Sequence, residues 1–166
     1  MTWSLQRFLE LLQPVIETVH QAPWDGALAI ELNETFGPGT DTFLQITEAC
    51  RSGVDEGWMG IEGDERRKGG RVLEPGPETR NLSVDVVEIA DIVGPHHRHP
   101  GGEVCAVLPV SEGARFDGNP QGWCVYPPGS AHFPSATDGR LRVMFFLPNG
   151  EIEYTDTDSS LRSGSG

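Results

Sequence analysis

The stretch that decides the fold reads Gly94-Pro95-His96-His97-Arg98-His99-Pro100-Gly101-Gly102-Glu103. In an extended segment the side-chain period is two, so His97 and His99 point to the same face. Glu103 follows four residues later, across a Pro-Gly-Gly turn that can fold its carboxylate back toward the two imidazoles. Two imidazoles and one carboxylate on one face are a common ligand set for a divalent metal ion.

A second histidine segment follows, and it reads Pro127-Pro128-Gly129-Ser130-Ala131-His132-Phe133-Pro134. The rigid Pro-Pro-Gly turn would place His132 at the start of a strand, where it could supply a fourth ligand. We therefore predict that one divalent metal is bound by His97, His99, Glu103 and His132. These ligand types suit iron, manganese, zinc, nickel and cobalt alike, and we favour Fe(II) or Mn(II).

His96 differs from its neighbours, because strand alternation should turn it away from His97 and His99. We keep it, with Glu103, as a candidate catalytic residue; the alternative is a position in solvent or behind the ligands. His20 belongs to a helical segment and is expected to be structural.

From residue 58 onward the chain reads as β-structure. Short runs rich in Val, Ile and aromatic residues predict strands near 58–62, 70–74, 82–89, 103–109, 123–126, 141–147 and 151–154. Residues 58–166 hold sixteen of the 21 Gly and ten of the 13 Pro, gathered in turns between these runs. Many short strands separated by such turns predict a sandwich or a small barrel.

Residues 1–57 read as helices that are too short to fold alone. Apolar residues at helical spacing predict a first helix from a cap at Ser4 to Val19, with a kink or a restart at Pro14. A second helix should begin at Asp25, and a third should run from Asp41 to a stop at Gly53. We expect a helical segment (1–57) that packs on a barrel (58–157), followed by a flexible tail (158–166).

The composition excludes several classes of function. Among 166 residues, 25 are acidic and 12 are basic, for a net charge of −13, which disfavours binding to nucleic acid or to an anionic membrane surface. The only lysine, Lys68, lies in a polar run, which argues against Schiff-base chemistry. Three cysteines without CxxC spacing, no signal-peptide pattern and no membrane-length apolar run predict a cytoplasmic protein. Cys105 and Cys124 are expected to be buried and inert.

The two histidine segments resemble a known pair of motifs. His97-x-His99-x-x-x-Glu103 is similar to the first cupin motif, and Pro127-x-Gly129-x-x-His132 is similar to the second. The resemblance covers roughly residues 58–155 and implies a mainly β fold: a double-stranded antiparallel barrel, or jelly roll, that holds a metal near its mouth.

A narrower resemblance spans nearly the whole chain. The segments that carry it are the helical preface, Glu74–Thr79, Ser83–Glu88, Gly94–Pro100, Gly113–Gly118 and Val125–His132. They look like the bacterial 4-hydroxylaminobenzoate lyase family, which acts in nitrobenzoate breakdown. This resemblance implies conversion of 4-hydroxylaminobenzoate to protocatechuate (3,4-dihydroxybenzoate) and ammonia.

A small aromatic carboxylate substrate would need a cation and an aromatic wall. Arg71 and Arg142 are the candidates for the carboxylate, because Arg suits planar bidentate pairing; Arg98 should point away from the ligands. Tyr126 and Phe133 could stack on the aryl ring, although both could be ordinary core residues.

Other interpretations remain open at this point. One is an iron-dependent cupin dioxygenase acting on a small aromatic or thiol substrate, and another is a non-enzymatic cupin that binds a small molecule. A carboxylate of Asp85 or Glu88 could shuttle protons in an enzyme, although strand carboxylates are more often surface residues. A homodimer is possible, because cupins commonly dimerise.

Overall fold

The computed structural model describes residues 2–155, so the predicted tail at 158–166 lies outside the described residues. Three helices come first: α1 (Leu5–His20), α2 (Gly26–Phe36) and α3 (Asp41–Asp55). The predicted cap of α1 is confirmed, because the Ser4 hydroxyl accepts a hydrogen bond from the Arg7 amide. The predicted start of α2 is also confirmed, with the Asp25 carboxylate accepting two backbone amides.

Two helix predictions need correction, namely the restart at Pro14 and the stop at Gly53. α1 continues through Pro14 without restarting, because its buried apolar stripe extends on both sides of the proline. α3 runs past Gly53 to Asp55. Gly53 does not end the helix. Packing requires glycine at this position, because a Cβ would lie 2.3 Å from Cγ of Met59.

Residues from 62 onward form two antiparallel sheets. The larger sheet has seven strands in the order β1-β2-β3-β9-β5-β7, with β6 also paired to β9, and the smaller has the order β10-β4-β8. The strands are β1 (Glu62–Gly63), β2 (Arg67–Leu73), β3 (Leu82–Val93), β4 (His97–His99), β5 (Glu103–Pro109), β6 (Arg115–Phe116), β7 (Gly122–Tyr126), β8 (Ser130–His132), β9 (Ser135–Pro148) and β10 (Glu153–Tyr154). A short 3₁₀ turn, η1 (Pro77–Thr79), precedes β3.

The predicted strands at 82–89, 103–109 and 123–126 fall within β3, β5 and β7, whereas those predicted at 58–62 and 70–74 begin or end elsewhere. The strand at 103–109 matches β5, whereas the expected strand at 58–62 is mostly a turn before the short β1. β2 begins three residues earlier than expected. His132 lies at the end of β8 and not at the start of a strand.

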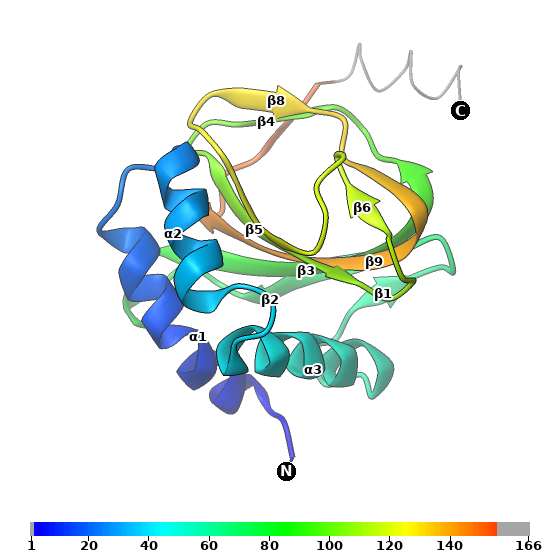
Figure 1. Cartoon of the computed structure of the whole chain (residues 1–166), viewed down its shortest axis with the longest axis horizontal. Coiled ribbons are helices and arrows are strands. Elements are labelled where there is room, and N and C mark those ends of the chain that lie inside the picture. The colour runs from blue at the N-terminus through cyan, green and yellow to red at the C-terminus, as the bar shows by residue number, and fades with distance from the viewer. Residues whose placement is uncertain (1, 156–166) are drawn as a thin grey trace.

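The helices pack against the outer face of the large sheet, and the inner face lines the barrel (Figure 1). On β5, Val104, Ala106 and Leu108 belong to the core shared with the helices. The alternate residues Cys105 and Val107 belong to a second core inside the barrel. Both faces of this strand are therefore buried.

The small sheet lies across the barrel from the inner face of the large sheet, where Figure 1 shows β4 and β8. A tight turn connects β4 to β5. Within it, Gly102 has φ of +88°, and a Cβ there would lie 2.7 Å from the Tyr126 carbonyl oxygen. Only glycine fits this turn without strain, so the turn sets where Glu103 enters the large sheet.

Candidate metal centre and adjoining pocket

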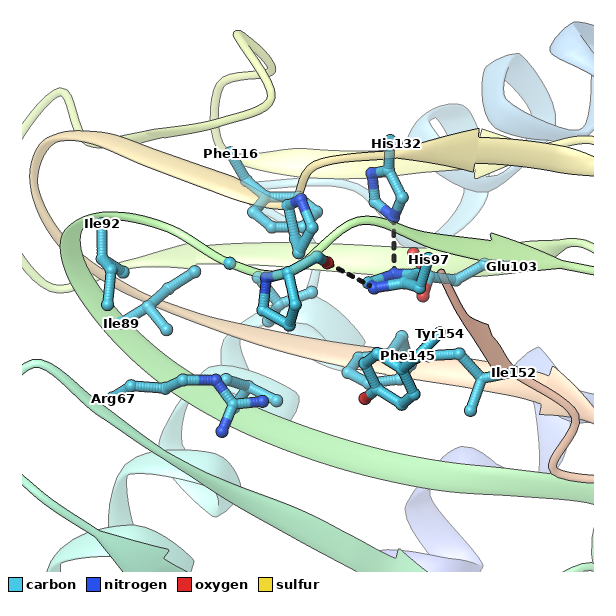
Figure 2. Close-up of a pocket in the computed structure, with 15 residues that line it drawn as sticks. Arg67, Ile89, Ile92, His97, Glu103, Phe116, His132, Phe145, Ile152 and Tyr154 are labelled. Atoms are coloured by element: carbon cyan, nitrogen blue, oxygen red, sulfur yellow. Dashed lines mark hydrogen bonds between the residues drawn. The ribbon is translucent and has the colours of Figure 1, made fainter. Parts of the chain in front are cut away.

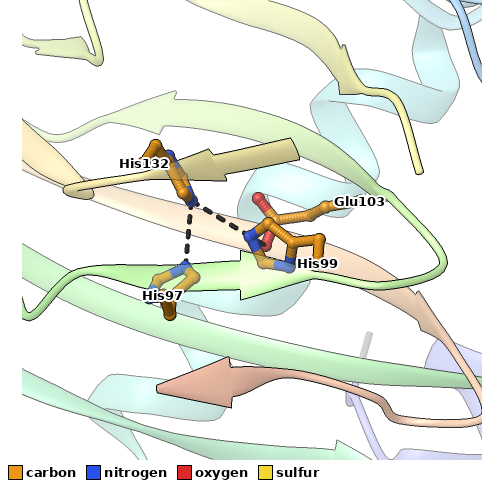
Figure 3. Close-up of side chains that lie close together, drawn as sticks. All are labelled: His97, His99, Glu103 and His132. Atoms are coloured by element: carbon orange, nitrogen blue, oxygen red, sulfur yellow. Dashed lines mark hydrogen bonds and ion pairs between the residues drawn. The ribbon is translucent and has the colours of Figure 1, made fainter. Parts of the chain in front are cut away.

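Four side chains converge where the two sheets meet, and they are the four predicted ligands (Figure 3). His97 and His99 lie on β4, His132 lies opposite them on β8, and Glu103 begins β5. One ligand atom from each residue lies within 4.8 Å of all the others. The distances are 2.9 Å from His132 Nε2 to His97 Nε2, 3.0 Å from His132 Nε2 to His99 Nε2, and 3.3 Å from His99 Nε2 to Glu103 Oε2.

The hydrogen bonds of two rings establish their tautomers. His97 Nδ1 lies 3.2 Å from the Pro95 carbonyl, which can only accept, so Nδ1 carries the proton. His132 Nδ1 lies 2.6 Å from the Asp117 carboxylate and donates to it. In the neutral rings both Nε2 atoms then carry lone pairs, which face each other at 2.9 Å. Such a pair repels unless a cation lies beside it, so the donor set fits a divalent metal.

Burial keeps the imidazoles of His97 and His99 neutral. It lowers the pKa of His97 to about 4, helped by the nearby His132. Burial also lowers the pKa of His99 to about 3, with His97 and His132 adding to the effect. Neutral imidazole is the form that binds a metal. At neutral pH the contact between His99 and Glu103 is therefore not a pair of opposite charges.

Glu103 is held from both sides. Its Oε2 faces His99, while its Oε1 accepts a hydrogen bond from the Cys105 thiol at 2.8 Å. Burial raises the pKa of Glu103 to about 7, and the thiol hydrogen bond partly opposes this. Cys105 is buried, as predicted. Its thiol nevertheless orients the carboxylate of Glu103.

Asp117 supports His132 from behind and was not predicted. Its Oδ2 accepts hydrogen bonds from His132 Nδ1 and from the Tyr126 hydroxyl, both at 2.6 Å, and its Oδ1 accepts the Ser135 amide at 2.8 Å. Burial alone would favour the neutral acid, but the hydrogen bonds from His132 and Tyr126 lower the pKa of Asp117. The ionised carboxylate thus holds His132 in one tautomer and one orientation.

A pocket opens beside the cluster inside the barrel (Figure 2). His97, Glu103 and His132 line one side of it, and His99 lies behind them, fully buried. The walls are mostly apolar and include Val87, Ile89, Ile92, Phe116, Val143 and Phe145. Ile152 and Tyr154 close the pocket from the C-terminal segment, and the Tyr154 ring meets the His97 ring edge-on at 5.5 Å. The pocket can hold a flat apolar ring against the ligand cluster.

The remaining predicted site residues lie outside this pocket lining. His96 Nδ1 lies 2.5 Å from the Thr155 hydroxyl, and its ring packs on Phe133 at 4.6 Å. Tyr126 packs on His132 at 4.6 Å and donates to Asp117. Tyr126 therefore contacts a candidate ligand, whereas His96 and Phe133 contact each other.

The two predicted arginines are engaged elsewhere. Arg142 lies on the helix-covered face of β9, where Nε donates to Glu88 at 2.8 Å and Nη2 approaches Asp55 of α3 at 3.5 Å. Arg71 donates to Asp85 at 2.8 Å. The structure brings neither guanidinium into the pocket lining, and it commits both candidate proton shuttles, Glu88 and Asp85, to ion pairs with these arginines.

Arg98 points away from the ligands, as predicted, and pairs with Glu153 at 3.3 Å. Among the arginines of the described part of the chain, Arg67 lines the pocket. Sequence reasoning missed it because the strand was expected to begin at residue 70, which left Arg67 in a loop where alternation says nothing about its face.

An antiparallel barrel with three histidines and a glutamate gathered beside an apolar pocket defines a cupin-type protein, which confirms the expected fold class. The chain belongs to the 4-hydroxylaminobenzoate lyase family, whose model (PnbB) matches residues 10–154. It is an enzyme of the lyase class. This membership argues against the interpretation of a non-enzymatic cupin.

Two curated relatives support the family assignment. A 4-hydroxylaminobenzoate lyase of Nocardioides sp. is 35% identical over 137 residues, covering 76% of this chain and 80% of that protein. A 4-hydroxylaminobenzoate lyase of Pseudomonas putida is 36% identical over 141 residues, covering 74% and 80%.

Solved structures align at lower similarity. An RmlC-like cupin protein from Ralstonia eutropha shares 15% identity over 57% of this chain and 64% of its own, with a TM-score of 0.43. The DMSP lyase DddQ from Ruegeria pomeroyi shares 15% identity over 91% and 95%, with a TM-score of 0.48. Among the described residues, no helix is long and apolar enough to cross a membrane.

Proposed function

We propose that this enzyme is a metal-dependent 4-hydroxylaminobenzoate lyase that takes up water and forms protocatechuate and ammonia. The observation that carries the proposal is the family match over residues 10–154, combined with a cluster of four ligand-type residues at one side of an apolar pocket. His97, His99, Glu103 and His132 would hold the metal.

The proposed reaction is balanced without an oxidant or a reductant. The N–O bond of the hydroxylamine breaks heterolytically, and its oxygen leaves as water after taking up a proton. One water adds at the neighbouring ring carbon and gives up a proton, which leaves an imine at the carbon that bears the nitrogen. A second water hydrolyses this imine to a carbonyl and ammonia leaves. The hydroxylated ring carbon then loses its own proton, the carbonyl oxygen takes one up, and the ring becomes the aromatic catechol. The net change is the addition of one water.

A bound divalent metal would polarise the hydroxylamine oxygen or lower the pKa of a bound water. The chain supplies the rest. Its apolar walls keep bulk water away from the ring, and Asp117 and Cys105 orient His132 and Glu103. Burial raises the pKa of Glu103 to about 7 in the metal-free cluster, so this carboxyl group must release a proton before it can hold the metal.

The direct test is anaerobic turnover of 4-hydroxylaminobenzoate by metal-reconstituted protein. Protocatechuate and ammonia should appear in equal amounts. Strict dependence on O2 would instead favour the dioxygenase alternative, and no product with Fe(II), Mn(II), Zn(II), Ni(II) or Co(II) would refute the substrate assignment.

Metal dependence has its own test. His99→Ala and His132→Ala, each shown to be folded, should lose at least 100-fold in turnover, and chelation should reduce the wild type to a similar level. Full activity of either variant after chelation would contradict a metal held by these histidines.

A further inference from the structure

Among residues 2–155, one cationic side chain lines the pocket beside the ligand cluster. Arg67 lies on β2, across the pocket from His97 and Glu103, as Figure 2 shows. Because most of the remaining described lining is apolar, the Arg67 end is where a negatively charged group on a bound molecule would find a partner.

The register of the large sheet directs Arg67 to this face. Arg67 pairs with Ile89 of β3, and Gly69 pairs with Val87. Directly paired residues share a face, and both Ile89 and Val87 line the pocket. Gly69 adds no side chain, so nothing from β2 stands between the Arg67 stem and the pocket wall at Val87.

Arg67 also differs from its neighbours in being unpaired. In the described part of the chain, 2–155, its exposed guanidinium takes part in no hydrogen bond or ion pair, although its charge acts at longer range on Asp64. Arg66 donates to the Asp91 carbonyl, Arg71 pairs with Asp85, and Arg140 pairs with Glu88. A guanidinium left unpaired at the edge of an apolar pocket can bind a carboxylate with two parallel hydrogen bonds.

We propose that Arg67 binds the carboxylate of the substrate and thereby makes the enzyme specific for aryl hydroxylamines that carry an anionic group on the ring, opposite the reacting nitrogen. This inference rests on the proposed function. The carboxylate would lie at the Arg67 end of the pocket, the ring between the apolar walls, and the hydroxylamine beside His97, Glu103 and His132.

The test compares a charged and an uncharged substrate. Arg67→Gln should lower kcat/KM for 4-hydroxylaminobenzoate by about 10- to 100-fold, as expected for loss of a charged hydrogen-bonding partner, mainly by raising KM. The same variant should change kcat/KM for the methyl ester of this substrate by less than about threefold. Arg67→Lys should recover part of the loss, because it restores the charge without the planar fork.

Arg66→Gln is the matched control, because it removes a neighbouring guanidinium that does not line the pocket; it should leave both substrates unaffected. Equal losses on the acid and the ester in Arg67→Gln, or no loss on the acid, would overturn the proposal.

Binding of 4-nitrobenzoate, measured by calorimetry, separates this inference from the proposed function because it needs no turnover. If the wild type fails to turn over 4-hydroxylaminobenzoate, the proposed function fails, while the role of Arg67 is still decided by Kd. Arg67→Gln should weaken 4-nitrobenzoate at least tenfold and leave methyl 4-nitrobenzoate unchanged. An unchanged Kd for 4-nitrobenzoate would refute the role.

Discussion

At the scale of single residues, the site depends on which ring nitrogen of His97 and of His132 carries the proton. Pro95 and Asp117 accept from the Nδ1 atoms of His97 and His132, and this turns two lone pairs toward one point. Neither partner belongs to the ligand spacing from which the site was predicted. Two groups outside the motif, the Pro95 carbonyl and the Asp117 carboxylate, therefore leave the Nε2 atoms of these histidines free to bind a cation.

Asp117→Asn should weaken metal binding by about 10- to 100-fold, the usual cost of removing a carboxylate behind a ligating histidine. The cause is loss of the charge that holds His132 in its Nδ1-protonated form. Competition with a chromophoric chelator measures the affinity. Asp138→Asn is the control, because Asp138 also has positive φ (63°, against 50° for Asp117) but is exposed. Equal affinities in the two variants would contradict the role of Asp117.

The pH dependence of metal affinity should carry the signature of Glu103. Its pKa of about 7 means that below this pH a proton must leave before the carboxylate can bind. The apparent affinity should therefore fall by up to about tenfold for each pH unit below 7 on account of this group. His97 and His99, with pKa values of about 4 and 3, add nothing to the slope above pH 5.

Chelator competition between pH 5 and 8 tests this for wild type and for Glu103→Gln. The variant should bind more weakly, with a slope of log affinity against pH that is shallower by about one. The same slope in both proteins would show that Glu103 is not the titrating group.

At the scale of elements, the turn between β4 and β5 joins three of the four candidate ligands. β4 carries two histidines, and the Pro-Gly-Gly turn reverses the chain so that Glu103 enters the large sheet beside them. Gly102 is the critical residue, because the left-handed backbone and the Tyr126 carbonyl both exclude a side chain.

Gly102→Ala should destabilise the metal-free protein by more than Gly113→Ala does, and it should also weaken metal binding. Gly113 has a similar φ of +82° but open space around its Cα, so it bears only the backbone strain, about 1–2 kcal/mol. Urea unfolding of both variants gives the comparison. Equal losses of unfolding free energy in the two variants would show that the close contact between the new Cβ and the Tyr126 carbonyl oxygen adds no destabilisation.

At the scale of the whole molecule, the cluster ties the two sheets together. The small sheet contributes the three histidines and the large sheet contributes Glu103, while the helices stabilise the large sheet from its outer face. A metal held by all four residues would link the wall that carries β4 and β8 to the rest of the barrel.

Adding saturating metal to the metal-free protein should therefore raise its melting temperature. A ligand at 100 times its Kd adds about 2.7 kcal/mol to the free energy of unfolding. His132→Ala should lose most of this gain, whereas His20→Ala, which alters an exposed residue of α1, should keep it. Differential scanning calorimetry gives the shift, and an equal gain in both variants would point to adventitious surface binding.

Most of the architecture could be predicted from the sequence, because it depends on the local spacing of apolar residues and of Gly and Pro. Helical periodicity separated residues 1–57 from the barrel, and the Gly and Pro clusters marked the turns. The edges were less accessible: β1 has two residues and β2 begins in the Arg-Arg-Lys run, so neither shows a hydrophobic alternation.

Local spacing alone established that His97, His99 and Glu103 could meet, because alternation and a tight turn act over a few residues. It could not establish which arginine faces the pocket. Arg67 and Arg142 lie on opposite faces of one sheet, and helices cover one of those faces while the barrel encloses the other. With both faces covered, the polarity of the strands does not mark the inside. Only tertiary packing assigned the faces, brought His132 to β4 and placed Asp117 behind it, because these contacts join segments that have no local relation.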